Sequence, residues 1–145
     1  MMKIAVLLKQ VPDLAEELEV DDSGKALDTE YIKFRLNEYD EHALEEAVSL
    51  KEAGQASEVA AIALDGEEVD KALFTAMAKG ADKAIKIIGA EAEGSRAVAS
   101  LFAEAVGTEY DLIMTGVQSV DDREGMMGPM LSSMLKIPCL SLINL

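Results

Sequence analysis

The sequence has few aromatic and basic side chains. It contains no Trp, its aromatic share is 4%, and 13 Lys and Arg stand against 28 Asp and Glu, which gives a formal net charge of −15. A surface this acidic repels nucleic acid and anionic membrane, because the dominant attraction to phosphate has the wrong sign. We therefore expect no nucleic-acid partner, and any phosphate site must depend on local N–H groups and dipoles.

Cysteine and long apolar runs are also scarce. Cys139 is the single cysteine, so no disulfide can form within the chain, which fits a reducing compartment. Because Cys139 lies in an apolar run, we expect a buried thiol. The N-terminus shows no signal-peptide pattern, and no apolar run approaches the about 18 residues that a membrane-spanning helix needs. These features predict a cytoplasmic protein without membrane insertion.

Catalytic and metal-binding patterns are absent as well. His42 is the only histidine, and the spacing suggests no serine or cysteine partner, so we expect a surface side chain and no catalytic residue. Asp121, Asp122 and Glu124 lie in one acidic loop around Arg123, but they match no EF-hand pattern. A solvated loop is the better interpretation, and we expect no metal site.

Short apolar runs alternate with amphipathic segments along the whole chain. Half of the residues are hydrophobic, and 145 residues suffice for one domain, residues 1–145, with a real core. Strands are predicted at residues 2–9, 59–64, 84–88, 112–114 and 138–145, and helices at 41–53, 67–79, 93–106 and 128–135. This alternation predicts an α/β fold: a Rossmann-like, three-layer α/β/α arrangement of a mainly parallel sheet with strand order 3-2-1-4-5.

An irregular insert interrupts this alternation at about residues 12–36. Pro12 cannot donate to a strand ladder and is predicted to end the first strand. The turn signal at residues 21–24 predicts a small surface hairpin between residues 18–20 and 26–27, and residues 31–34 are predicted to be extended. Asn37 or Asp40 is the expected N-cap of the next helix.

The stretch at residues 111–129 is the best candidate for a binding site. A short strand ends at Gly116, an acidic loop follows, and a small-residue segment at 125–129 opens a helix whose free N–H groups and dipole favour a phosphate. The stretch matches neither GxGxxG nor GxxxxGK[ST], and similar units without ligands are common. In the predicted strand order, residues 7–10, 37–40, 64–66 and 116–127 meet where the order reverses, the usual place for a ligand.

Four ordered blocks together resemble the β subunit of electron-transfer flavoprotein. They are KIAVLLKQVPD, LNEYDEHALEEAVSLKEAG, ALFTAMAKGADKAI and YDLIMTGVQSVDDREGMMGP. The resemblance implies an adenine nucleotide alpha hydrolase-like fold and a heterodimer with an α subunit that carries FAD. Such a heterodimer passes electrons from acyl-CoA or other dehydrogenases to an acceptor, and the β subunit is an electron carrier subunit with no bond chemistry of its own.

The same resemblance implies where a cofactor binds. In the family the β subunit holds AMP or, in electron-bifurcating members, a second FAD, and the resemblance leaves the two open. Leu7 corresponds to a backbone contact to the adenine, and residues 37–40 correspond to the family's N-P-F-x stretch. The implied cofactor-binding residues are Leu7, Asn37, Glu38, Tyr39, Asp40, Leu64, Gly116, Val117, Gln118, Ser119, Val120, Asp121, Asp122, Arg123, Glu124, Gly125, Met126 and Met127.

The sequence departs from the family pattern at three places. The phosphate-facing residues 125–127 offer only backbone N–H groups where a Gln or Asn is usual, and Arg123, which replaces an acidic residue, either contacts the phosphate or pairs with Glu124. Full β subunits continue beyond the position of Leu145, so the resemblance predicts a fragment or a shortened relative. The alternative is a free-standing, self-associating adenine-nucleotide module resembling universal stress proteins, although the glycine-rich loop of that family is not obvious here.

Overall fold

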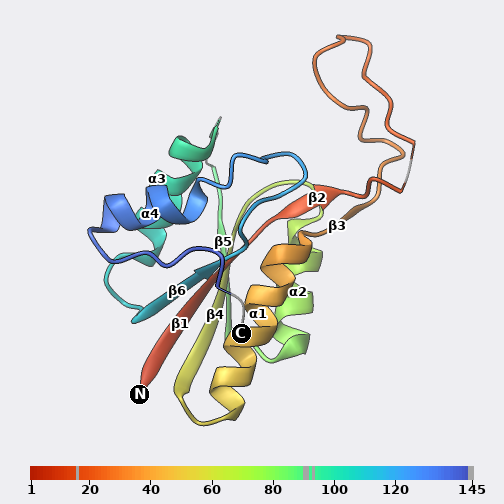
Figure 1. Cartoon of the computed structure of the whole chain (residues 1–145). Coiled ribbons are helices and arrows are strands. Elements are labelled where there is room, and N and C mark those ends of the chain that lie inside the picture. The colour runs from red at the N-terminus through yellow and green to blue at the C-terminus, as the bar shows by residue number, and fades with distance from the viewer. Residues whose placement is uncertain (16, 90–91, 93, 144–145) are drawn as a thin grey trace.

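The centre of the molecule is a four-stranded parallel sheet (Figure 1). The computed structural model describes residues 1–15, 17–89, 92 and 94–143. Its strands are β1 (Met2–Leu8), β4 (Ala56–Leu64), β5 (Lys83–Ile87) and β6 (Leu112–Thr115), in the order β5-β4-β1-β6. This order confirms the predicted arrangement of the first four strands, 3-2-1-4.

Two helices cover each face of the sheet, which confirms the three-layer α/β/α prediction (Figure 1). The helices α1 (Glu38–Glu52) and α2 (Val69–Lys79) lie on one face, and α3 (Ser95–Val106) and α4 (Met127–Leu135) lie on the other. The predicted start of α3 at Glu93 lies outside the described residues. No helix in the described ranges is long and apolar enough to cross a bilayer.

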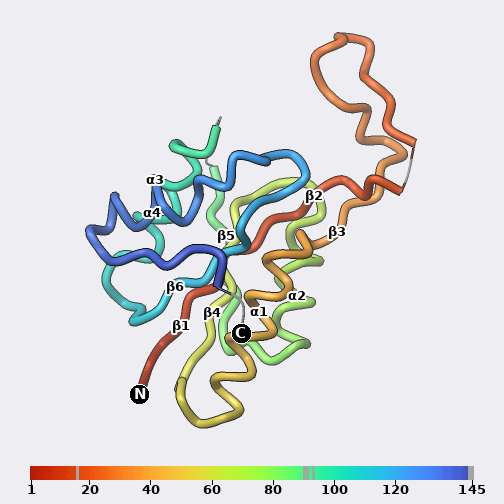
Figure 2. The backbone as a smooth tube through the Cα atoms, viewed as in Figure 1, coloured from red at the N-terminus to blue at the C-terminus, as the bar shows by residue number. Residues whose placement is uncertain are grey.

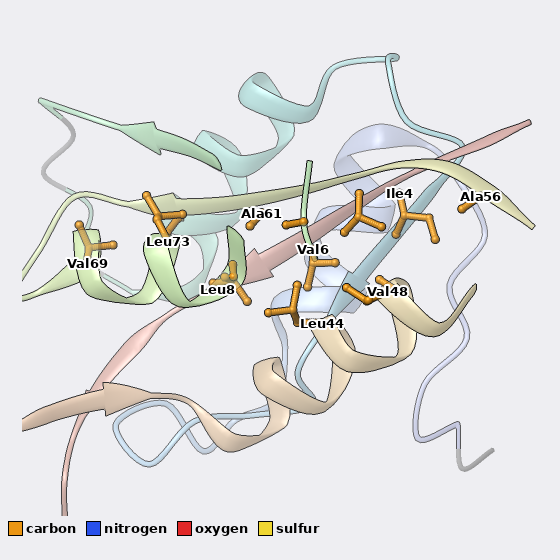
Figure 3. Close-up of a cluster of buried hydrophobic side chains, with 14 residues drawn as sticks. Ile4, Val6, Leu8, Leu44, Val48, Ala56, Ala61, Val69 and Leu73 are labelled. Atoms are coloured by element: carbon orange, nitrogen blue, oxygen red, sulfur yellow. The ribbon is translucent and has the colours of Figure 1, made fainter. Parts of the chain in front are cut away.

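β1 supplies both halves of the core, because alternate side chains of a strand point to opposite faces. Ile4, Val6 and Leu8 face α1 and α2, where they join Leu44 and Val48 (Figure 3). The intervening Ala5 and Leu7 face α3 and α4 instead. Each fully buried Ile or Leu contributes about 1.5–3 kcal/mol of transfer free energy, so β1 is the apolar centre of the fold.

The predicted fifth strand is wrong. Within residues 138–143 the structure has no strand, and the last two residues of the predicted range lie outside the described part. Leu142 has a φ of +55°, which interrupts an extended backbone, and Pro138 has no N–H to donate. The side chains of this segment are exposed, and Cys139 is exposed with them, so the expectation of a buried thiol is also wrong.

The insert forms a two-stranded base and a projecting loop. After Lys9 the chain continues as β2 (Gln10–Pro12), which pairs antiparallel with β3 (Phe34–Leu36), so Pro12 lies inside a short second strand. Beyond this base, an antiparallel bridge between Val20 and Leu27 confirms the predicted surface hairpin. Figure 2 shows the hairpin extending away from the rest of the molecule.

Candidate functional site

The carboxyl ends of β1 and β6 meet the first turn of α1 at the edge where the strand order reverses (Figure 1). β1 is followed by Lys9, β6 by Gly116, and Asn37 directly precedes α1. The loop at residues 116–126, which leads from β6 to α4, starts here. The sequence prediction placed a ligand at this edge, and the contacts below describe how the edge is built.

Asp40 joins the ends of the two neighbouring strands. Its carboxylate accepts the amide N–H of Lys9 at 3.0 Å and the amide N–H of Gly116 at 2.9 Å. A Cβ at Gly116 would lie 2.4 Å from Asp40 Oδ1 and 2.8 Å from Asp40 N, so no side chain fits at this position. Asp40 is only 7% exposed and therefore acts as a structural tie between strands rather than as a group facing solvent.

Burial raises the pKa of Asp40 to about 6. Loss of hydration disfavours the charged carboxylate, and this effect outweighs the hydrogen bonds from Asn37, Gly116 and Lys9 and the positive charge of Lys9, all of which favour it. A protonated carboxyl group has one O–H to donate and cannot accept both N–H groups equally well. Even so, the raised pKa means that the folded state favours the protonated form of Asp40 more than the unfolded chain does, so protonation near pH 6 relieves the cost of the buried charge.

Lys9 contacts the loop at residues 116–126 and forms an ion pair with Asp121 of that loop. Its Nζ is 2.8 Å from Asp121 Oδ2 and 3.4 Å from Ser119 Oγ, and Ser119 Oγ donates to Asp121 Oδ1 at 2.6 Å. Partial burial alone would raise the pKa of Asp121, but the hydrogen bonds from Lys9 and Ser119 hold it below its ordinary value. Both charged side chains are almost half exposed, so the pair is worth only about 0–1 kcal/mol and an anion can compete for Lys9.

Two further contacts fix the first half of the loop. Asn37 Nδ2 donates to Gln118 O at 2.8 Å, and Ser95 Oγ, at the start of α3, donates to Asp122 Oδ2 at 2.7 Å. Asn37 holds the N-cap position of α1, as one of the two predicted alternatives had it, but its side chain makes no capping bond. Its amide is used for the loop instead.

The second half of the loop presents backbone donors. In the part of the chain that the structure describes, the amides of Gly125, Met126 and Met127 donate no hydrogen bond. Met127 begins α4, whose helix dipole places positive potential at these amides. Gly125 has a φ of +65°, and a Cβ there would lie 2.9 Å from Val117 O, so glycine is needed to turn the chain into this position.

The structure brings some of the predicted site residues together and separates others. Hydrogen bonds through Lys9 join the following predicted site residues into one network: Asn37, Asp40, Gly116, Gln118, Ser119, Asp121 and Asp122. The side chain of Leu7, in contrast, is buried between the sheet and α3 and α4, so only its backbone can face a ligand. Leu64 packs toward the same cluster at the end of β4. Tyr39 is 43% exposed beside Gly116.

The remaining charged and titratable side chains considered in the sequence analysis lie at the surface. Arg123 and Glu124 are both exposed and form no ion pair with each other in the described residues. His42 is exposed, which confirms the surface prediction. No group of three His, Cys, Asp or Glu side chains is placed to hold a metal ion within the described ranges.

The sequence analysis placed residues 7–10 at this edge but did not count two of their polar side chains among the site residues. Lys9 and Gln10 follow a buried strand directly, which is the one signal that could have marked them. Gln10 Nε2 donates to Glu68 O at 3.1 Å, and this bond fixes the orientation of the amide. Its Oε1 is then buried without a donor from the residues that the structure describes, and a buried acceptor without a partner costs about 1–3 kcal/mol.

Comparison with known proteins gives a consistent answer. The family model "Electron transfer flavoprotein domain" matches residues 25–144. The chain is 36% identical over 141 residues to "Electron transfer flavoprotein subunit beta" of Methylophilus methylotrophus, covering 94% of this chain and 53% of that protein. It is 34% identical over 147 residues to the subunit of the same name from Bacillus subtilis, covering 99% and 56%.

A eukaryotic relative matches to a similar extent. The protein called "Electron transfer flavoprotein subunit beta" in Dictyostelium discoideum is 33% identical over 138 residues, with 94% of this chain and 55% of that protein covered. The chain thus spans about half the length of the curated relatives it matches. These matches show that the chain belongs to the electron transfer flavoprotein family and is related to its β subunits.

Proposed function

We propose that the chain holds the adenylate part of a nucleotide, either AMP or the AMP half of FAD, at the carboxyl edge between β1 and β6. The observation that carries this proposal concerns the backbone amides of residues 125–127, whose N–H groups donate no hydrogen bond to any described residue. These amides lie at the start of α4, beside the point where the strand order reverses. Amides at a helix N-terminus are suited to a phosphate group. The printed names of the relatives support the assignment to an electron-transfer subunit.

The residues at this edge fit a phosphate group, although they supply little positive charge. The chain is strongly acidic, so backbone donors and the dipole of α4 must supply most of the attraction. Lys9 can add a positive charge if it leaves Asp121, because their ion pair is half exposed. Gly116 and Gly125 allow a loop backbone at positions where a Cβ would collide with Asp40 Oδ1 and Val117 O.

The chain's own residues position the cofactor and do no bond chemistry in this proposal. Asp40 and Asn37 hold the loop against β1 and α1, and residues 125–127 bind the phosphate. A flavin, when bound with the α subunit, supplies the redox chemistry. The complete assembly would pass electrons from acyl-CoA or other dehydrogenases to an acceptor. In it, this chain would act as an electron carrier subunit rather than as an enzyme. We propose that it is a single domain located in the cytoplasm.

Nucleotide analysis tests the proposal directly. The chain is purified alone and together with its cognate α subunit, and the nucleotides released by denaturation are identified by mass spectrometry. We expect AMP or FAD in amounts comparable to the protein, and calorimetric binding of AMP that GMP does not reproduce. Finding neither nucleotide and no AMP binding contradicts the proposal. Binding of ATP by a self-associated chain without any flavin would favour the stand-alone module.

A further inference from the structure

Residues 17–31 form a projecting element that we call the arm (Figure 2). None of these residues is buried. The arm is anchored at its base by Val11 and Ile32, which are 1% and 8% exposed, and by a hydrogen bond from Asp13 N to Lys33 O at 2.8 Å. The arm is thus firmly attached to the body but makes no part of its core.

The arm has a defined shape. Asp21 N donates to Ala26 O and Asp28 N donates to Glu19 O, both at 2.9 Å, on either side of the Val20–Leu27 bridge. At the tip, Asp21 Oδ1 accepts the amide of Ser23 at 3.0 Å. These bonds close a short hairpin, so a partner would meet a preformed surface instead of an open chain.

The arm exposes more apolar surface than a solvated hairpin needs. Leu18, Val20, Leu27 and Tyr31 are 39%, 61%, 36% and 80% exposed. An isolated two-stranded hairpin is marginally stable in water, because it has no third strand or helix to cover its apolar side chains. Val20 and Leu27 are paired across the antiparallel bridge, and neighbouring exposed apolar side chains favour an interaction surface.

The charge of the arm selects the kind of partner. The arm carries six acidic residues and one basic residue: Glu17, Glu19, Asp21, Asp22, Asp28 and Glu30 against Lys25. Its net charge of −5 repels a second copy of a chain whose own net charge is −15. The complementary surface is a protein groove with an apolar floor and a rim of Lys and Arg.

The two chain segments that connect the arm to the body, its first and second legs, both begin beside residues of the candidate site. The first leg reaches the body through β2, which follows Lys9, and the second returns through β3, which precedes Asn37. Asn37 N donates to Lys9 O at 2.8 Å where the two legs meet the sheet. A protein that covers the arm down to this base would therefore reach the carboxyl edge of the sheet, where Lys9 and Asn37 lie.

We propose that the arm docks in a basic-rimmed, apolar groove of the α subunit and so places that subunit against the carboxyl edge of the sheet. The identity of the partner rests on the proposed function, whereas the arm's shape, exposure and charge do not. Apolar side chains of the hairpin supply the contact area, and its carboxylates orient the encounter.

Binding of the purified cognate α subunit to immobilised chain tests this proposal. The double variant V20S/L27S removes two apolar contacts on opposite legs of the arm, and F74S serves as the control, because Phe74 is 73% exposed on α2. We expect V20S/L27S to weaken α-subunit binding about tenfold or more, as loss of central apolar contacts does at other interfaces. F74S should leave the affinity unchanged, and both variants should bind AMP as the parent does.

A charge variant keeps the test decisive if V20S/L27S fails to fold. The double reversal E17K/E30K should weaken binding at low salt and reduce its dependence on ionic strength, because the steering charges change sign. Unchanged affinity in either folded arm variant, an equal loss in F74S, no binding of the α subunit by the parent chain, or self-association that V20S/L27S abolishes would each overturn the proposal. Failure of AMP binding alone would contradict the proposed function and leave arm-dependent docking standing.

Discussion

Asp40 Oδ1 accepts the amide N–H of Gly116 at 2.9 Å, although the two residues lie 76 positions apart in the chain. The same carboxylate accepts the amide of Lys9, so one buried side chain connects α1 with the ends of β1 and β6. Parallel strands leave their last N–H groups without partners in the ladder, and Asp40 satisfies one on each strand. The loop of the candidate site starts from this tie.

Replacing Gly116 by Ala should break the tie. The new Cβ would lie 2.4 Å from Asp40 Oδ1 and 2.8 Å from the backbone nitrogen of Asp40, which cannot move independently of α1. We expect G116A to lower the free energy of unfolding by about 1–3 kcal/mol, as overpacking does, and to weaken AMP binding. Urea denaturation measures the first effect. The control G66A, where a Cβ meets no atom within 4 Å, should leave the stability nearly unchanged, and equal stability of the two variants would contradict the account.

The raised pKa of Asp40 predicts an unusual pH dependence of stability. Because its folded pKa of about 6 lies above the ordinary value of 3.8, the folded state binds the proton more tightly than the unfolded state does. This contribution is fully present below the ordinary value and is lost as the pH rises to about 6, by on the order of 2–3 kcal/mol. Asp40→Asn should abolish it, so the parent's stability relative to D40N should fall across this window and be level above it.

Denaturation of the parent and D40N at a series of pH values gives this difference. Glu38→Gln is the matched control, because Glu38 is an exposed carboxylate in the same turn of α1. A stability difference between parent and D40N that does not change between the two pH limits would show that Asp40 keeps its ordinary acidity in the folded protein.

The ion pair between Lys9 and Asp121 predicts opposite effects of two substitutions on nucleotide affinity. If Lys9 exchanges Asp121 for a phosphate, K9Q removes the positive charge that would contact the phosphate. D121N, in contrast, releases Lys9 from its ion pair and removes a carboxylate that repels the phosphate. We expect K9Q to weaken AMP binding and D121N to strengthen it, each by about three- to tenfold at low salt. Calorimetric titration measures both. Changes of the same sign in the two variants would exclude the exchange.

The exposed position of Cys139 predicts a reactive thiol in the folded protein. The side chain contacts Ser141 Oγ at 3.8 Å and is not covered by the core. A thiol reagent should therefore modify native Cys139 at a rate close to that in denaturant, since access and not unfolding controls the reaction. Strong protection in the native state would restore the sequence-based expectation of a buried thiol.

The sequence was sufficient for the sheet because β1 and β4 are continuous apolar runs separated by helices of amphipathic pattern. It was insufficient for the segment at residues 138–143, because an apolar run without periodicity does not reveal the left-handed backbone at Leu142. Exposed apolar side chains, as at Leu140, are equally invisible to composition.

The site was predictable in position but not in its contacts. Gly116 ends an apolar run, which placed the loop correctly, and small residues at 125–127 indicated an open helix start. The roles of Asp40 and Lys9 depend on pairings between segments far apart in the sequence, such as Asp40 with Gly116 and Lys9 with Asp121. A residue-type pattern contains no information about these distances, so Asp40 was taken for a residue beside the nucleotide and Lys9 was not singled out.

The amide NMR resonances of Gly125, Met126 and Met127 during a titration with AMP test the central claim most directly. The account predicts that these three resonances shift with a common affinity, because their N–H groups donate no hydrogen bond to any described residue and donate to the phosphate on binding. Resonances of the distant Gly54 should stay in place. Saturation of AMP binding without movement at residues 125–127, or no binding at all, would contradict it.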